Sequence, residues 1–262
     1  MIKTNYHTHH ELCKHAVGTA EDYVKEAIKL NMNVLGFSDH APSDVIHDKR
    51  VRMSWDDLDV YLDDVIKTKA KYSDKLDIYV GLEIESIDPN PDYYLGLLKK
   101  VDYLILGQHY IPSITHENRL SSSFYLRDDK ELILYAKSIE KAIKTGYFSL
   151  IAHPDLYMCE FPKWNEAAHE AAEIICNASV KYNVPLEFNA NGIRRGKFQA
   201  KDGLRYHYPV EAFWKLAKAK NCKVILSSDC HKPTYLYDDA MKKAESLLKR
   251  LDITPIEVLP FK

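Results

Sequence analysis

The chain has 262 residues, 46% of them hydrophobic and 28% charged, as expected of a globular protein with a sizeable core. Its formal net charge of -2 gives no electrostatic reason to expect nucleic acid or an anionic membrane as a partner. No apolar run approaches the roughly 20 residues that span a bilayer, and the N-terminus runs directly into a strand-like segment rather than a secretory signal. The five cysteines are scattered and form no CxxC motif, so we expect a reducing, cytoplasmic location.

Strand-like and helix-like segments alternate from one end of the chain to the other. The strand-like segments are short and often apolar on consecutive positions, as in strands buried on both faces. They cover residues 2–8, 34–38, 76–83, 103–108, 148–153, 186–189 and 224–228. Helical spacing follows at 54–71, 128–144, 164–182, 209–220 and 237–250. Thr19 is the expected cap of a first helix, and Pro209 suits the first turn of a later one.

Seven βα units in one direction predict a parallel α/β sheet. Its commonest closed form is a barrel related to the (β/α)8 fold, here with seven units. Because no linker-like or repeated segment interrupts the chain, we expect one domain over residues 1–262. Residues 41–53, 111–126 and 191–208 read as long loops after strands, where barrel enzymes keep their specificity residues.

Most of the predicted strands end in a histidine or a carboxylate, and twelve histidines occur in all. In a parallel barrel these ends meet at one face, where the active sites of such barrels lie. The strand-end residues are His7 and His9, then Asp39 and His40, Glu83, His109, His153, and Asp229 with His231. The sixth strand ends in Asn189, a polar group but a poorer ligand.

Imidazoles and carboxylates together suit zinc, manganese or iron. Seven histidines and two carboxylates are too many donors for one four-coordinate ion. They suit two or three divalent ions if Glu83 bridges. One of the seven, His15 in the first loop, has no strand-end argument and is included mainly on the family resemblance described below. One histidine at a strand end is more often a structural residue than a ligand. A purely structural role does not explain the whole set, because burying imidazoles and carboxylates without partners costs free energy.

Other polar residues near the predicted strand ends are not expected to bind metal themselves. Asp39 and Asp155 are expected to orient ligating imidazoles, and Asn189 to support the site. His10 points away from His9 in an extended chain and is expected to be solvated.

The order of these motifs along the chain resembles the PHP family, named for polymerase and histidinol phosphatase. The matching segments are Tyr6-His7-Thr8-His9, His15, Ser38-Asp39-His40, Gly81-Leu82-Glu83, Gly107-Gln108-His109, Ile151-Ala152-His153-Pro154-Asp155 and Ser228-Asp229-Cys230-His231. The resemblance implies a distorted, TIM-like (β/α)7 barrel with a trinuclear metal centre. It implies that one ion is held by His7, His9, Glu83 and Asp229, a second by Glu83, His109 and His153, and a third by His15, His40 and His231.

Within the family, a free-standing chain of this size most resembles histidinol-phosphate phosphatases of histidine biosynthesis. The resemblance implies a phosphate-binding arginine on the sixth-strand loop, where Arg194 and Arg195 are both available. Some relatives carry another arginine after the fifth-strand histidine, but here Leu156-Tyr157-Met158-Cys159-Glu160 contains none.

The expected chemistry is in-line attack on a small phosphate monoester by a metal-bridging hydroxide. Glu83, Asp229 and the histidines would hold that hydroxide. The divalent ions carry more positive charge than the two carboxylates cancel, so the centre favours a dianion. The group that protonates the leaving group and the oligomeric state, including a homo-oligomer, stay open.

Several alternatives remain. They are a related phosphatase acting on another small ester, a nucleotide or phosphotyrosine, an amidohydrolase-type enzyme, an exonuclease-like phosphodiesterase, and a non-catalytic metal-binding module. Amidohydrolases usually bridge their metals through a carboxylated lysine on the fourth strand, whereas His109 ends that strand here. The net charge of -2 disfavours a nucleic-acid track, and the intact donor set disfavours a module without catalysis.

Overall fold

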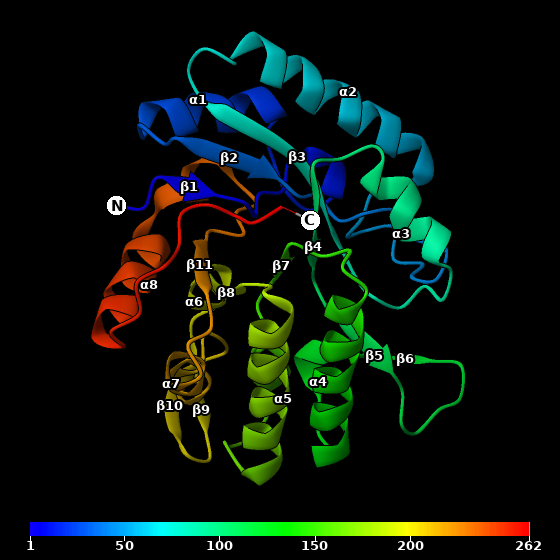
Figure 1. Ribbon diagram of the computed structural model, residues 1–262, viewed down its shortest axis with the longest axis vertical. Helices are drawn as coiled ribbons and strands as arrows, with labels where there is room; N and C mark the ends of the chain where they lie inside the picture. Colours follow the sequence, from blue (N-terminus) through cyan, green and yellow to red (C-terminus); the bar gives the residue numbers. More distant parts are fainter. Residues whose placement is uncertain (262) are drawn as a thin grey trace.

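The computed structural model describes residues 1–261 and is built on a parallel seven-stranded sheet (Figure 1). The sheet order is β1 (Thr4–Asn5), β2 (Val34–Phe37), β3 (Asp77–Ile84), β4 (Tyr103–Leu106), β7 (Leu150–Ile151), β8 (Leu186–Asn189) and β11 (Val224–Ser227). Beyond the first and last strands, Thr8 pairs with Cys230, whose carbonyl accepts from the N–H of His9 at 3.0 Å. The sheet is therefore nearly closed, and the distorted barrel with seven parallel strands is confirmed.

Helices cover the outside of this sheet. They are α1 (Ala20–Lys29), α2 (Trp55–Lys71), α3 (Pro91–Leu98), α4 (Asp129–Lys144), α5 (Glu166–Tyr182), α6 (Asn191–Arg194), α7 (Glu211–Ala219) and α8 (Asp239–Arg250). Short 3-10 turns lie at η1 (Glu11–Cys13), η2 (Ser123–Tyr125), η3 (Leu156–Met158) and η4 (Pro233–Tyr237). Figure 1 shows α1 and α2 side by side over β2 and β3, and α4 beside α5. Thr19 caps α1 as predicted, in a reciprocal capping box with Asp22.

The structure differs from the sequence-based expectation at three connections. Two of the long segments expected to be loops contain antiparallel hairpins, β5 (Tyr110–Pro112) with β6 (Leu120–Ser122) and β9 (Lys197–Ala200) with β10 (Gly203–Tyr206). Pro209 lies before the cap of α7, not in its first turn, and follows a cis peptide bond. Helix α3 was not predicted, because its eight residues are too few to show a clear helical period.

Tyr103 fills the centre of the barrel. Its ring is fully buried, and its hydroxyl donates to the carbonyls of Tyr6 at 2.7 Å and Phe37 at 3.0 Å. A Cβ at Gly36 or Gly81 would lie 2.3 or 2.4 Å from this side chain, so the two glycines make room for it. One side chain thereby links β4 to β2 and to the residue that follows β1.

The C-terminal tail closes the opposite end of the barrel. The N–H of Leu259 donates to the Tyr6 hydroxyl at 3.3 Å, and that hydroxyl donates to the carbonyl of Glu257 at 3.1 Å. Leu259 is 1% exposed and packs with Ile105, Leu150 and other residues of the barrel interior. Figure 1 shows this segment turning back toward the centre of the molecule after α8. The tail is therefore part of the core and not an appendage.

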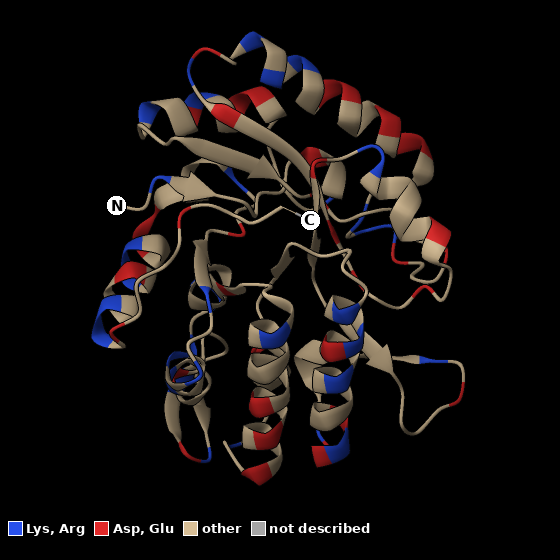
Figure 2. Ribbon diagram, in the orientation of Figure 1, with Lys and Arg blue, Asp and Glu red and all other residues tan. Residues whose placement is uncertain are grey.

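Charged side chains are concentrated on the outer helices. Figure 2 shows acidic and basic residues interleaved along α4 and α8, whereas α2 and α5 carry their acidic residues toward the N-terminal end and their lysines toward the C-terminal end. Within residues 1–261, no helix is both long and apolar enough to cross a membrane.

We predict that Leu259→Ala lowers the free energy of unfolding by about 2–4 kcal/mol, because it leaves a cavity in the barrel interior. Val258→Ala is the matched control, since Val258 is 74% exposed and should change stability by less than about 0.5 kcal/mol. Urea unfolding followed by circular dichroism measures both. Equal effects of the two substitutions would show that the tail does not contribute to the core.

Candidate metal centre

The histidines and carboxylates predicted from the strand ends come together at one end of the barrel. Glu83, at 1% exposure, lies at the centre of this group. Its Oε2 is 3.2 Å from His7 Nε2 and 3.4 Å from His9 Nε2, and its Oε1 is 3.0 Å from His153 Nε2. The carboxylate therefore reaches two neighbouring sets of imidazoles at once.

On one side of Glu83, three donor atoms converge from the segment after β1 and the loop after β11. Those of His7, His9 and Asp229 all lie within 4.8 Å of one another. Asp229 Oδ1 is 3.6 Å from His7 Nε2 and 3.3 Å from His9 Nε2. These three residues with Glu83 form a first candidate ligand set.

On the other side of Glu83, the donors come from the ends of β4 and β7. Glu83 Oε1 is 3.3 Å from His109 Nε2 and 3.0 Å from His153 Nε2, and the two imidazole centroids are 4.9 Å apart. Glu83, His109 and His153 form a second candidate set, which shares its carboxylate with the first.

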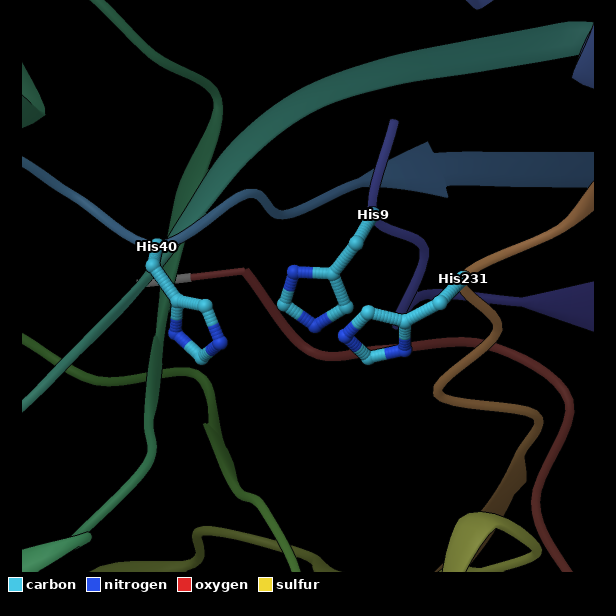
Figure 3. Close-up of side chains that lie close together, drawn as sticks. All are labelled: His9, His40 and His231. Carbon is cyan, nitrogen blue, oxygen red and sulfur yellow. The ribbon is translucent and has the colours of Figure 1, made fainter. Parts of the chain in front are cut away.

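A third group of imidazoles lies at the mouth of the barrel. Figure 3 shows His9, His40 and His231 facing a common space, from the first strand end, the second strand end and the loop after β11. The ring of His9 is 4.5 Å from that of His40 and 4.4 Å from that of His231. His15 joins them, with its Nε2 2.9 Å from His231 Nε2. His9 thus lies between the first set and the third.

The protonation pattern of two of these rings fits a bound cation. His15 Nδ1 contacts the carbonyl of Cys13 at 2.9 Å, and His231 Nδ1 contacts that of Asp229 at 3.2 Å. A carbonyl only accepts, so both Nδ1 atoms carry the hydrogen and both Nε2 atoms present lone pairs to each other. Two facing lone pairs repel each other unless a proton or a metal ion lies between them, and imidazole nitrogen is a preferred donor for zinc, iron and similar metals.

Electrostatics favours the protonation states that metals require at Glu83, His40 and His231. Burial would raise the pKa of the Glu83 carboxyl, but His7, His109 and His40 lower it well below its usual value. Burial lowers the pKa of His40 well below its usual value, and burial beside His9 lowers that of His231 to about 3. The carboxylate is therefore ionised and these two imidazoles are neutral at physiological pH. Burial would lower the pKa of His7 and of His109 as well, but Glu187 raises the first and Glu83 the second.

The backbone at two candidate ligands is held in the left-handed region. His153 has φ 30° and Asp229 has φ 48°, values that non-glycine residues adopt at a cost of order 1–3 kcal/mol. Both residues follow directly on strand ends, and both side chains reach the shared donor cluster. The strained backbone at His153 and Asp229 thus directs their side chains into the donor cluster.

A pocket of about 360 Å³ opens over the donor cluster. Its size is suited to a small molecule, and its walls include Tyr110, Phe124, Arg195, Tyr208 and Tyr235 besides the candidate ligands. The guanidinium of Arg195 lies 4.7 Å from the centroid of the Phe124 ring. Arg195 is therefore placed to meet an anion in the pocket.

Arg194 is engaged elsewhere. Its Nε donates to Asp238 Oδ2 at 2.7 Å, and its Nη2 donates to the carbonyl of Tyr235 at 2.8 Å and to Ser228 Oγ at 3.0 Å. These bonds join α6 to the start of α8 and to the end of β11. Of the two neighbouring arginines, Arg194 therefore holds secondary-structure elements together, whereas Arg195 lines the pocket.

Residues 5–191, well over half of the chain, match the PHP domain. The chain belongs to the PHP family. It is 26% identical to a protein named "Probable histidinol-phosphatase" from Deinococcus radiodurans, over 90% of each chain. It is 25% identical to the histidinol-phosphatase of Bacillus subtilis, over 88% of this chain and 94% of the relative.

Two solved structures of other proteins share the fold. One is a candidate histidinol phosphatase from Listeria monocytogenes, with TM-score 0.73 at 20% identity, covering 92% of this chain and 99% of the other. The second is a histidinol phosphate phosphatase from Lactococcus lactis, with TM-score 0.67 at 17% identity, covering 97% and 95%. That crystal structure is described as a complex with zinc, L-histidinol and phosphate.

The PHP barrel also contains buried carboxylates that the sequence did not single out. Glu187 on β8 is fully buried, and its Oε1 contacts His7 Nδ1 at 2.8 Å. Its Oε2 accepts from Asn189 Nδ2 at 2.7 Å and from the N–H of His153 at 3.0 Å. Glu85 contacts His109 Nδ1 at 2.9 Å. Each residue lies two positions from a predicted site residue, Asn189 or Glu83, so strand alternation could have revealed both.

Three sequence-based expectations for supporting residues need correction. Asp39 Oδ1 accepts from the N–H of His10 at 2.7 Å and its Oδ2 lies 2.7 Å from His10 Nδ1, so this carboxylate faces His10 and not a candidate ligand. His10 is accordingly buried and not solvated. Asp155 Oδ2 accepts from the N–H of Val210 at 2.6 Å and from Trp214 Nε1 at 3.0 Å. Asn189 does lie where expected, with its Nδ2 3.1 Å from Asp229 Oδ2.

Gly107→Ala is predicted to weaken metal binding about 10- to 100-fold. A Cβ at this position would lie 2.1 Å from Glu83 Oε1, so the shared carboxylate would have to move. Gly96→Ala is the matched control, because a Cβ there meets nothing within 4 Å and favours the helix by about 0.5–1 kcal/mol. Zinc titration against a chromogenic chelator measures both. Unchanged affinity in Gly107→Ala would show that the site does not need Glu83 in this position.

Proposed function

We propose that this PHP protein is a metal-dependent phosphomonoesterase that hydrolyses L-histidinol phosphate to L-histidinol and phosphate in histidine biosynthesis. The observation that carries the proposal is the nine-residue donor cluster around Glu83 beneath a pocket that Arg195 enters. Relatives named for this activity cover nearly the whole chain, which supports the choice of substrate.

We infer that the donors serve as three overlapping ligand sets for divalent ions. His7, His9, Glu83 and Asp229 would form one set, Glu83, His109 and His153 a second, and His15, His40 and His231 a third. Ions bound there would supply Lewis acidity for the phosphoryl oxygens and would make nearby water more acidic. Zinc, manganese and iron all suit this mixture of imidazole and carboxylate.

The protein's own contribution is orientation and charge. Glu187 accepts from His7 Nδ1 and fixes that ring with its Nε2 toward Glu83 and Asp229. Arg195 is exposed at the pocket, and its guanidinium would neutralise a phosphoryl oxygen as negative charge develops there. The stacked Phe124 ring holds the guanidinium over the pocket.

The remaining expectations are part of the same proposal. We propose one domain over residues 1–262, supported by the packing of Leu259 against the interior of the barrel. A small phosphate ester as substrate, without nucleic acid or membrane as a partner, and a cytoplasmic location stay predictions.

The proposed function is tested by phosphate release from L-histidinol phosphate beside a panel of nucleotides, phosphotyrosine and simple monoesters. We expect kcat/KM for histidinol phosphate to exceed the others by several orders of magnitude. Activity should be lost on chelation and restored by manganese or zinc. If another monoester is preferred, the phosphatase activity stands and the place in histidine biosynthesis is wrong. Faster cleavage of bis(p-nitrophenyl) phosphate or of an amide would overturn the phosphomonoesterase proposal itself.

Substituting the two neighbouring arginines should separate catalysis from stability. Arg195→Met is expected to lower kcat/KM by about 10²-fold with little effect on unfolding, because one stabilising donor is lost from the pocket. Arg194→Met should instead lower the free energy of unfolding by roughly 3 kcal/mol, because Asp238 loses its partner. Steady-state kinetics and urea unfolding of both variants provide the comparison. A kinetic loss confined to Arg194→Met would reverse the assignment.

A further inference from the structure

A buried ion pair lies in the pocket wall beside the candidate metal ligands. Arg52, in the segment after β2, donates from Nη2 to Glu85 Oε1 at 2.8 Å and from Nη1 to Glu85 Oε2 at 3.2 Å. The two side chains are 5% and 3% exposed. A second bond from Nη1, to the carbonyl of Ala41 at 3.0 Å, holds Arg52 next to the residue that follows His40. The pair is thus rigidly placed where two strand ends meet.

Glu85 also controls one of the candidate ligands. Its Oε1 contacts His109 Nδ1 at 2.9 Å, while His109 Nε2 faces Glu83 Oε1 at 3.3 Å. An ionised carboxylate only accepts, so Nδ1 carries the hydrogen and Nε2 is left as the donor atom for a metal. The contact therefore fixes both the tautomer and the rotation of the His109 ring.

The charge of Glu85 would oppose the proposed substrate if it stood alone. Glu85 and Arg52 both line the pocket that Arg195 enters. An uncompensated carboxylate here, in addition to those of Asp48, Glu83 and Asp229 that also line the pocket, would repel a phosphate dianion, and in a partly buried site such repulsion is screened weakly. The guanidinium group of Arg52 neutralises the charge of Glu85, and Glu85 can still accept a hydrogen bond from His109.

We propose that Arg52 and Glu85 are positioning residues of the metal centre. Glu85 holds His109 with Nε2 toward the metal site, and Arg52 neutralises Glu85 so that an anion can enter the pocket. The part that concerns His109 depends only on the donor cluster. The part that concerns the anion rests on the proposed function.

The first arm of the test measures zinc binding by competition with a chromogenic chelator. Glu85→Ala is expected to weaken the affinity for at least one ion 10- to 100-fold. Glu85→Gln should recover much of that loss, because its amide oxygen can still accept from His109 Nδ1. The matched control is Glu21→Gln, which removes a carboxylate paired with Lys71 on the outer surface and should bind zinc like the parent protein.

The second arm measures the dissociation constant of inorganic phosphate for the zinc-loaded protein by calorimetry, at saturating metal. Arg52→Met should weaken phosphate binding roughly tenfold, because it leaves Glu85 unneutralised. Glu85→Gln should strengthen it, because it leaves the charge of Arg52 unopposed. Arg52→Lys should stay close to the parent protein, since the charge is kept. A purely structural role predicts the same direction for Arg52→Met and Glu85→Gln.

Unchanged zinc affinity in Glu85→Ala overturns the role assigned to Glu85. Phosphate affinities that move in the same direction in Arg52→Met and Glu85→Gln overturn the role assigned to Arg52. If Glu85→Ala does not fold, the nitrogen-15 chemical shifts of the His109 ring are measured in metal-free Glu85→Gln and Arg52→Lys instead. We predict a single His109 tautomer with the hydrogen on Nδ1 in both variants. Loss of that tautomer contradicts the proposal. If no variant, the parent included, hydrolyses a phosphate ester, the proposed function fails, while the zinc arm still tests Glu85.

Discussion

One buried carboxylate determines the arrangement of the site. Glu83 lies within about 3.4 Å of imidazole nitrogens on both of its sides, and it is almost without solvent. An ionised carboxylate in such a position is stable only among cations or strong donors, so the surrounding imidazoles and any bound ions depend on it, and it depends on them. The barrel meets this requirement by ending its strands in histidines and by leaving no side chain at Gly107.

Periodicity in the sequence was sufficient to predict the barrel and the strand-end members of the donor cluster, whereas His15 was predicted from the resemblance to the PHP family. Short apolar segments located the seven strands, and the polar residue at each end identified the face where donors meet. The cap of α1 was also predictable, since a threonine followed three positions later by an acidic residue is a local signal.

Features that depend on tertiary register could not be predicted in this way. Arg52 lies in an irregular segment, and its partner Glu85 is known only once β3 and the preceding loop are placed together. Arg194 and Arg195 are adjacent in sequence, and only the single turn of α6 directs one to Asp238 and the other over Phe124. Asp39 and Asp155 failed as predicted partners of ligands because the nearest donors, His10 and Trp214, come from packing and not from strand order.

The contacts between residues far apart in the sequence have a consequence for how the chain folds while it is being translated. His15 and His231 face each other across 216 positions, and Tyr6 bonds Leu259 across 253. A chain emerging from the ribosome displays its first histidines long before their partners exist. Forming contacts between residues so far apart in the sequence also costs the most loop-closure entropy. The complete donor set can therefore form only after His231 has been synthesised, and a chain truncated before His231 would present a partial set of imidazoles.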